Sequence, residues 1–197
     1  MRNVIAAVTS AAALLLLAGC MTVVDAPVGT YKVGEAYQVS LGRHWADVSA
    51  IMLDRSHGVH VLSVDGPLLN RLYLSEGLGA GDSLVKSTVK EKPTPTYKTD
   101  FSPTETVEFV ADSVAALGYQ KVETSHLRPG RFGNEDGLRF DLVAKTTDGL
   151  DVSGSAMIAQ KGGRLYVILF LAPTEHFFGD AAPEIDAIMN SVQFHGV

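Results

Sequence analysis

Cysteine is almost absent from this chain of 197 residues, which has a single one, Cys20. The residues after Cys20 therefore cannot form a disulfide, supply a thiolate nucleophile or bind a metal through sulfur. Basic residues are also scarce, because 16 lysines and arginines stand against 22 aspartates and glutamates, a formal net charge of −6. This charge argues against nucleic acid as a partner, since phosphate binding needs a basic surface.

The sequence also lacks an apolar run with the length of a membrane span. The apolar stretch from Val4 to Leu17 follows the positive charge of Arg2 and has the length of the hydrophobic region of a secretory signal peptide. We interpret residues 1–19 as a signal peptide that is removed. Its removal takes away Arg2 and makes the mature chain more acidic.

The end of this stretch, Leu17-Ala18-Gly19-Cys20, resembles the lipobox of bacterial lipoprotein signal peptides. The resemblance implies that the Cys20 thiol is acylated and that the new amino terminus is acylated after cleavage. Several acyl chains hold a protein stably on a membrane, whereas one binds only reversibly. In Gram-negative lipoproteins an aspartate after the cysteine favours the inner membrane, so Met21 implies the outer membrane, facing the periplasm. The alternative is a soluble secreted protein with an incidental cysteine.

The mature chain is expected to be one domain on a short tether. Residues 20–33 have no clear periodicity and are interpreted as the lipidated N-terminus and its tether. Residues 34–197 have the length and composition of a single α+β domain. Within it, the stretch 86–100 (KSTVKEKPTPTYKTD) is predicted to be a polar surface connection between two halves.

The first half of the domain shows strand signals. Residues 37–41 alternate between apolar and polar side chains, which predicts a strand, and residues 59–64 and 68–74 predict a hairpin around Gly66-Pro67. The apolar residues between Trp45 and Met52 have helical spacing, but a strand that ends at a bend is an alternative.

The second half has clearer signals. Ser102-Pro103-Thr104-Glu105 matches a capping box, and apolar residues at helical spacing follow it as far as Leu117. Strands are predicted over 138–144, 150–158 and 165–171, and a second helix over 183–192. Residues 165–171 are apolar on both faces of the predicted strand. We therefore expect an α+β fold in which two or more amphipathic helices cover an antiparallel sheet.

This second half resembles a PsbP-like domain. The resemblance rests on the helix from Glu105 to Leu117, the hairpins at Asp148-Gly149 and Gly162-Gly163, the strand LYVILFLAP and the closing helix with its tail Ser191-Val192-Gln193-Phe194. It covers roughly half of the chain and implies a PsbP-like sandwich. PsbP-like folds serve as accessory, scaffold and binding proteins, so the resemblance implies a non-catalytic module.

A competing hypothesis comes from Gly81-Asp82-Ser83-Leu84, which matches the GDSL string of a family of serine esterases and lipases. The resemblance implies Ser83 as a nucleophile, with a histidine from a later Asp-x-x-His as its base. That partner is missing after Ser83, because the match Asp54-Arg55-Ser56-His57 precedes it. The alternative is that residues 81–84 form a polar turn.

The remaining motifs predict no metal site and no cofactor. His57 and His60 would point to opposite faces of a strand, and no third ligand has a matching spacing. His176-Phe177-Phe178 suits either an aromatic contact surface or packing under the last helix. Two hypotheses follow. The first is a lipid-anchored, non-catalytic binding or accessory module with an envelope protein as partner, and the second is a lipid-anchored serine esterase.

Overall fold

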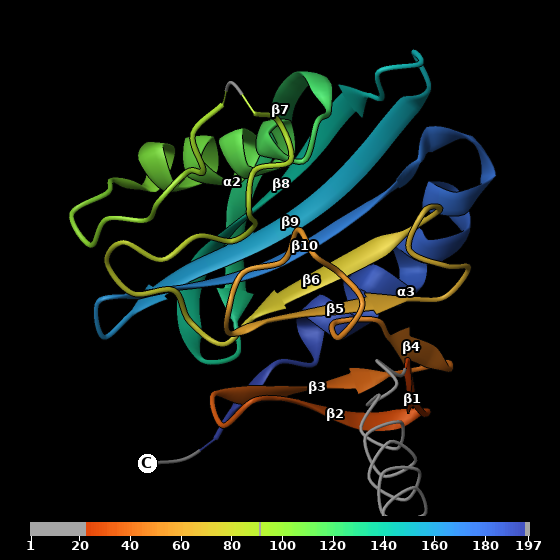
Figure 1. Cartoon of the computed structure of the whole chain (residues 1–197). Helices are drawn as coiled ribbons and strands as arrows, with labels where there is room; N and C mark the ends of the chain where they lie inside the picture. The colour runs from red at the N-terminus through yellow and green to blue at the C-terminus, as the bar shows by residue number, and fades with distance from the viewer. Residues whose placement is uncertain (1–22, 91, 196–197) are drawn as a thin grey trace, which may run out of the picture.

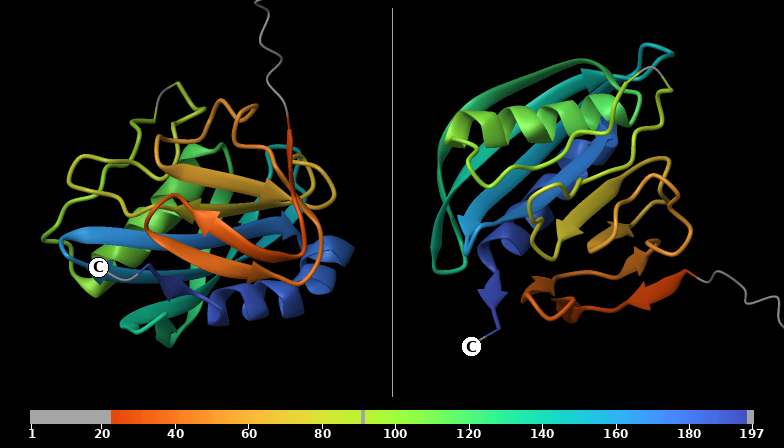
Figure 2. Two further views of the ribbon diagram at one scale, coloured as in Figure 1. Left: turned by 90° about the horizontal axis from the view of Figure 1, so that it is seen from below. Right: turned by 60° about the vertical axis from the view of Figure 1, so that its left-hand side comes forward.

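The computed structural model describes residues 23–90 and 92–195. Antiparallel strands dominate it and form two sheets, one above the other (Figures 1 and 2). The strands are β1 (Val24–Ala26), β2 (Gly29–Val33), β3 (Tyr37–Leu41), β4 (Trp45–Asp47), β5 (Val59–Ser63), β6 (Arg71–Ser75), β7 (Gln120–Phe132), β8 (Glu135–Lys145), β9 (Asp151–Lys161), β10 (Arg164–Pro173) and β11 (Gln193–Phe194). The other elements are helix α2 (Pro103–Ala116), a kinked turn (Thr174–Phe178) and helix α3 (Gly179–Asn190).

The larger sheet contains eight of the described strands, in the order β1-β4-β5-β6-β10-β9-β8-β7, and the smaller contains three, in the order β11-β3-β2. Strands β8, β9 and β10 confirm the three predicted strands of the second half. Gly149 and Gly163 have φ values of +87° and +74° in the turns between them, a conformation that glycine adopts at little cost. β10 lies in the middle of the sheet and is buried on both faces, as its apolar sequence predicts.

Two hydrophobic cores lie on opposite faces of the larger sheet. The first contains Val167 and Leu169 of β10 and the buried side of α2. The second contains Ile168 and Phe170 of β10, together with side chains of β3 and α3. Because successive residues of a strand point to opposite faces, β10 contributes to both cores in turn.

Helix α2 confirms the capping prediction. The Ser102 hydroxyl accepts a hydrogen bond from the Glu105 amide at 3.3 Å, and the Glu105 carboxylate accepts one from the Ser102 amide at 2.7 Å. Pro103 occupies the first helical position, where it removes no helical hydrogen bond. Gly118, with φ +98°, follows the C-terminus.

The predicted cover of two or more amphipathic helices is wrong. On the first face α2 is the helix that packs against the sheet. Loop side chains such as Val85 and Tyr97 belong to the same core. On the second face much of the cover is the three-stranded sheet, with α3 packed beside β3 (Figure 1). The sequence did not predict this sheet, because β2 and β11 are short and bury few side chains.

Several N-terminal segments have regular structure that their sequence does not signal. Residues 24–26 and 29–33, placed in the tether by the sequence analysis, form β1 and β2. β3 and the hairpin of β5 and β6 confirm their predictions. Of the two alternatives for residues 45–52, the structure has the strand, β4, followed by a bend. The long edge strand β7 was not predicted, because most of its side chains are exposed and do not alternate.

Candidate functional site

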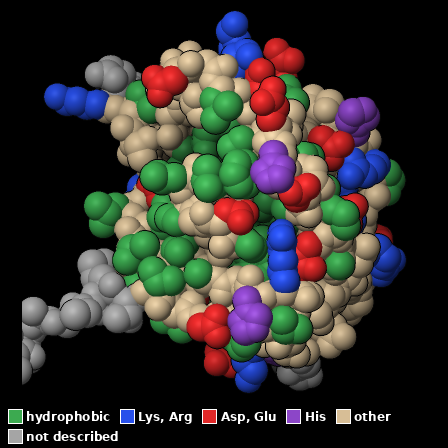
Figure 3. Space-filling view, turned by 90° about the vertical axis from the view of Figure 1, so that its right-hand side faces the viewer, with side chains coloured by type: hydrophobic (Ala, Val, Ile, Leu, Met, Phe, Trp, Pro, Cys, Tyr) green, Lys and Arg blue, Asp and Glu red, His purple; other side chains and the backbone are tan. Residues whose placement is uncertain are grey.

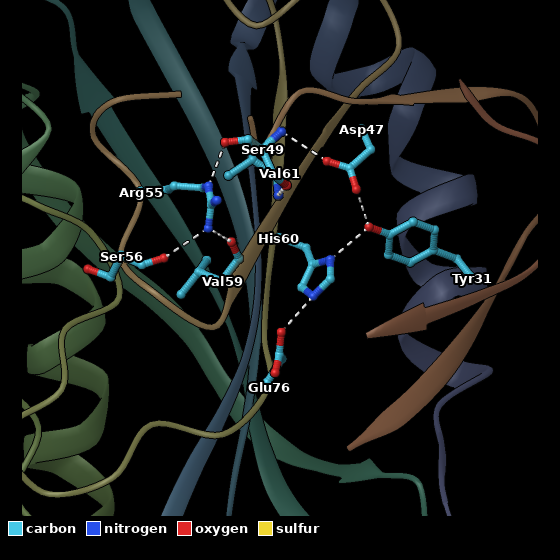
Figure 4. A network of polar contacts seen from close by, with 9 residues as sticks. All are labelled: Tyr31, Asp47, Ser49, Arg55, Ser56, Val59, His60, Val61 and Glu76. Carbon is cyan, nitrogen blue, oxygen red and sulfur yellow. Dashed lines mark hydrogen bonds and ion pairs between the residues drawn. The ribbon is translucent and has the colours of Figure 1, made fainter. Parts of the chain in front are cut away.

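The most connected group of polar side chains lies between the two sheets and consists of Tyr31, Asp47, His60 and Glu76 (Figure 4). We call it the inter-sheet network. Tyr31 comes from β2 in the small sheet, Asp47 and His60 come from β4 and β5 in the large sheet, and Glu76 follows β6. It therefore joins segments that are far apart in the sequence.

The period of the strands explains how these four residues meet. Residues two positions apart on a strand point to the same face. Each member of the network is two positions from a residue of the second core: Tyr31 from Val33, Asp47 from Trp45, His60 from Leu62, and Glu76 from Leu74. The network is consequently the polar margin of that core.

The four side chains form a continuous chain of hydrogen bonds. The Tyr31 hydroxyl lies 2.6 Å from Asp47 Oδ2 and 2.9 Å from His60 Nδ1. His60 Nε2 lies 2.9 Å from Glu76 Oε1. The second Asp47 oxygen accepts a hydrogen bond from the Ser49 amide at 2.9 Å. The contacts extend further, because the Ser49 hydroxyl accepts a hydrogen bond from the Val61 amide.

The protonation states follow from the burial and the partners of these groups. Burial, together with the hydrogen bond to Asp47, raises the pKa of Tyr31 far above its ordinary value of 10.0, so its hydroxyl stays protonated. Burial alone would raise the pKa of Asp47, but hydrogen bonds from Ser49 and Tyr31 outweigh this effect and hold the pKa below its ordinary value of 3.8. Asp47 is therefore an anion at neutral pH, and Tyr31 donates its proton to it.

The hydrogen bond from Tyr31 to Asp47 determines which partner donates in the contacts of His60. Because the Tyr31 proton points to Asp47, the Tyr31 oxygen is left as an acceptor for His60 Nδ1. Glu76 can also only accept when it is ionised. His60 makes both of its contacts only when both ring nitrogens carry protons, that is, as the imidazolium cation. The two contacts of His60 link β2 to β5 and to the residue that follows β6.

The network offers little room for chemistry on a substrate. Its members form hydrogen bonds with one another. None of them is a serine, threonine or lysine that could act as a nucleophile beside the imidazole. His60 has only 21% of its side-chain surface exposed. Gly34, with φ +53°, packs so closely on the Glu76 carboxylate that a methyl group there would displace it. The network therefore links β2 to the larger sheet through side-chain hydrogen bonds.

The comparisons agree with this architecture. No family model matches the chain, and no curated protein matches its sequence. One of the solved structures that resemble it is the solution structure of cyanobacterial PsbP (CyanoP) from Synechocystis, with a TM-score of 0.51. The chain has a PsbP-like fold. The superposition covers 91% of this chain and 96% of that one at 13% identity, so the likeness extends well beyond the half that the sequence indicated.

Within the PsbP-like fold, Ser83 lacks the partners of an esterase nucleophile. Among the described residues no hydrogen bond joins Ser83 to a histidine or a carboxylate. The Asp82 carboxylate accepts a hydrogen bond from the Gly79 amide at 2.8 Å, and residues 79–82 form a turn closed by the Asp82 amide and the Gly79 carbonyl. Asp54, in the upstream Asp-x-x-His, pairs with Arg71 at 2.9 Å. The polar turn thus covers residues 79–82, Ser83 and the buried Leu84 follow it, and the esterase hypothesis has no support.

The other residues singled out in the sequence have separate places. Leu17, Ala18, Gly19 and Cys20 lie outside the described residues. His57 is exposed in a turn, and among the described residues no hydrogen bond joins it to the network that holds His60. Phe177 and Phe178 pack against the second core, with the Phe178 ring stacked on Phe170 at 6.1 Å, which confirms packing rather than an open aromatic surface.

The described residues contain no group of three or more histidine, cysteine, aspartate or glutamate side chains suited to a metal ion. In the described part of the chain, no helix combines the length and the apolar character needed to cross a bilayer.

A second feature is the clustering of exposed apolar side chains at one end of the large sheet. Leu68 is 91% exposed and Leu53 is 84% exposed. Leu68 lines two adjoining hollows, one with Ile51 and Leu53 and the other with Leu69 and Leu150. We call Ile51, Leu53, Pro67, Leu68, Leu69 and Leu150 the apolar end. Figure 3 faces this side of the molecule and shows hydrophobic side chains gathered over one half of it.

Proposed function

We propose that this protein is a lipid-anchored, non-catalytic accessory module of the bacterial cell envelope, held at the outer membrane and facing the periplasm. The observation that carries the proposal is Leu17-Ala18-Gly19-Cys20, because it combines small residues and a lone thiol immediately after an apolar run. In this proposal residues 1–19 are the cleaved signal peptide and Cys20 carries the lipid.

A non-catalytic role accords with the chemistry of the described residues. The network of Tyr31, Asp47, His60 and Glu76 uses its polar atoms to join strands. Among the described residues, no hydrogen bond joins Ser83 to a histidine or a carboxylate. The PsbP-like fold, which accessory proteins share, fits a module that presents a surface to an envelope protein. What this module contributes is a rigid, anchored surface.

The anchor is tested by replacing Cys20. Cys20→Ala is expected to abolish metabolic labelling with radioactive palmitate and to move the protein from the membrane fraction to the soluble periplasmic fraction. Ser83→Ala is the matched control, because it changes one small side chain and should leave both results unchanged. Unchanged membrane fractionation of Cys20→Ala would overturn the anchor.

The choice of membrane is tested at the next residue. Since an aspartate after the lipidated cysteine favours inner-membrane retention, Met21→Asp is expected to move the protein from the outer to the inner membrane in a sucrose gradient. Met21→Ser is the control and should leave it in the outer membrane. An unmodified protein that already sediments with the inner membrane would contradict this part of the proposal.

The non-catalytic part is tested by active-site labelling. A fluorophosphonate, which reacts with activated serines, is expected to leave the folded protein unlabelled. Labelling that disappears in Ser83→Ala would restore the esterase hypothesis.

A further inference from the structure

We propose that the apolar end lies directly on the lipid bilayer, with Leu53 and Leu68 inserted into its interfacial region. This inference rests on the lipid anchor of the proposed function. It adds an orientation and a second membrane contact. The protein then sits on the membrane by one defined end and does not swing freely on a tether.

The two leucines are almost fully exposed. A leucine that is 91% or 84% exposed gains almost nothing from the fold, yet each would gain on transfer out of water, as apolar surface does in general. Both lie on turns or loops that project from the sheet, Leu53 between β4 and β5 and Leu68 between β5 and β6. Together with Ile51, Leu69 and Leu150 they form a clustered apolar surface, whereas single exposed apolar residues are ordinary.

The first described strand lies beside the loop that carries Leu53. Val24 pairs with Asp47, and the loop that carries Ile51 and Leu53 begins at the next residue, Val48. Cys20 precedes the first described residue, Val23, by three positions. Three residues of extended chain reach about 10 Å. A lipid on Cys20 thus brings the bilayer surface close to the base of this loop.

Several polar groups of the turn around Leu68 are paired within the turn. The Leu69 and Asn70 amides donate hydrogen bonds to the Gly66 carbonyl at 2.9 and 3.1 Å. The Asn70 side chain accepts from the Ser63 hydroxyl and donates to Asp65. Groups that are already paired lose little when water is replaced by lipid, whereas unpaired groups lose their hydrogen bonds to water without replacement.

One ion pair and one lysine at this end suit the contact, and the exposed Asp65 carboxylate accepts a hydrogen bond from the Asn70 side chain. Asp54, beside Leu53, is neutralised by Arg71 at 2.9 Å, and both side chains are largely covered. Lys86 lines the same hollow as Leu53 and Leu68 and is exposed, so its long side chain can reach the headgroups. The occupant that fits an apolar tip with a neutralised ion pair and a lysine at its rim is a lipid interface.

The chain offers a clean test because Cys20 is its only cysteine. Leu68→Cys introduces one free thiol into the lipidated protein, which is labelled with a nitrobenzoxadiazole fluorophore and reconstituted into phosphatidylcholine vesicles. We expect a blue shift and a several-fold rise of its emission, and quenching by nitroxide-labelled phosphatidylcholine. Leu127→Cys is the matched control, since Leu127 is 55% exposed and lies on β7 at the far edge of the sheet from β1. Its label should keep the emission seen in water.

The other outcomes distinguish failure of the lipid contact from failure of the anchor. A label at position 68 that keeps its aqueous emission in vesicles overturns it, and so does a blue shift without lipid that grows with protein concentration, because a second copy then covers the surface. Labelling of the unsubstituted protein would show a free Cys20 thiol and contradict the anchor instead. In that case Cys20→Ser with Leu68→Cys is titrated with the same vesicles. A rise of emission would retain the lipid contact, and no change would overturn it as well.

Discussion

At the scale of single residues, the inter-sheet network shows how position alters the role of a polar side chain. Tyr31 and Tyr37 are separated by six positions, and both lie on the small sheet. The hydroxyl of Tyr31 has two partners, whereas the hydroxyl of Tyr37 is buried without a hydrogen-bond partner among the described residues. The two tyrosines therefore make a matched pair for measuring what the network contributes.

Tyr31→Phe is expected to lower the free energy of unfolding by about 1–2 kcal/mol, because it leaves the half-buried Asp47 without one hydrogen bond and breaks the link to His60. Tyr37→Phe removes an unpaired buried hydroxyl and should be neutral or stabilising. Urea unfolding at neutral pH measures both. Equal losses in the two variants would contradict the assignment of the network as a link between the sheets.

Asp47→Asn is expected to show a pH-dependent effect. The folded protein holds the pKa of Asp47 below its ordinary value of 3.8, so the unfolded chain binds the proton more readily. The carboxylate therefore stabilises the fold at neutral pH, and this contribution disappears as the pH falls through the folded pKa. The substitution should cost about 2 kcal/mol at pH 7, as hydrogen bonds to charged groups do, and progressively less below pH 4.

The measurement for Asp47→Asn is urea unfolding at a series of pH values from 7 to 3. Asp148→Asn is the control, because Asp148 is exposed in the turn between β8 and β9 and should show no such pH dependence. A cost for Asp47→Asn that stays constant down to pH 3 would show that the carboxylate charge is not what matters.

At the scale of secondary-structure elements, local sequence accounts for those elements that complete their own polar contacts. Helix α2 has a full capping box, and strands β8 to β10 are joined by tight turns with glycine at the required positions. β7 is different, because register shifts interrupt its pairing with β8 and both Lys121 and His126 have positive φ. Its extended form depends on pairing with β8, since its own sequence does not alternate.

Ser102→Ala is expected to destabilise the protein by about 1 kcal/mol, the usual cost of removing an N-cap side chain. The Ser102 hydroxyl accepts the Glu105 amide at the start of α2, and alanine cannot replace it. Thermal or urea unfolding followed by circular dichroism measures the loss. Thr104→Ala is the control, because Thr104 is exposed in the first turn and should change stability by less than about 0.5 kcal/mol.

At the scale of the whole molecule, the two sheets share the second core and should unfold together. Trp45, the only tryptophan, is buried in this core with its ring 6.4 Å from that of Phe170. Phe194 of β11 packs on Tyr37, Phe132 and Tyr166, with ring centroids 4.9–6.0 Å away. Aromatic side chains from both sheets thus hold the layers together.

Phe194→Ala is expected to lower the free energy of unfolding by about 3 kcal/mol, near the lower limit for phenylalanine because Phe194 is only partly buried. The transitions seen by tryptophan fluorescence and by far-ultraviolet circular dichroism should coincide before and after the change. Leu127→Ala, at an exposed position, should leave both unchanged. Separate transitions would mean that the small sheet detaches on its own.

The sequence alone determined the parts of this protein that depend on neighbours within a few residues. It predicted α2 with its cap, the strands β8 to β10 with their turns and a PsbP-like likeness in the second half. Periodicity and capping depend on residues that are close in the sequence, so a single sequence is enough to predict them. The lipobox is also local, and lipidation at Cys20 stays a prediction, since that residue lies outside the described part.

Only the tertiary structure decided what covers the large sheet and which polar residues meet. Tyr31, Asp47, His60 and Glu76 are dispersed over four segments, and each becomes part of the network because its strand places it two positions from a core residue. The apolar end likewise combines turns that are distant in the sequence. Contacts of this kind depend on strand order and register. The local sequence pattern does not determine either, because the same pattern is compatible with several strand arrangements.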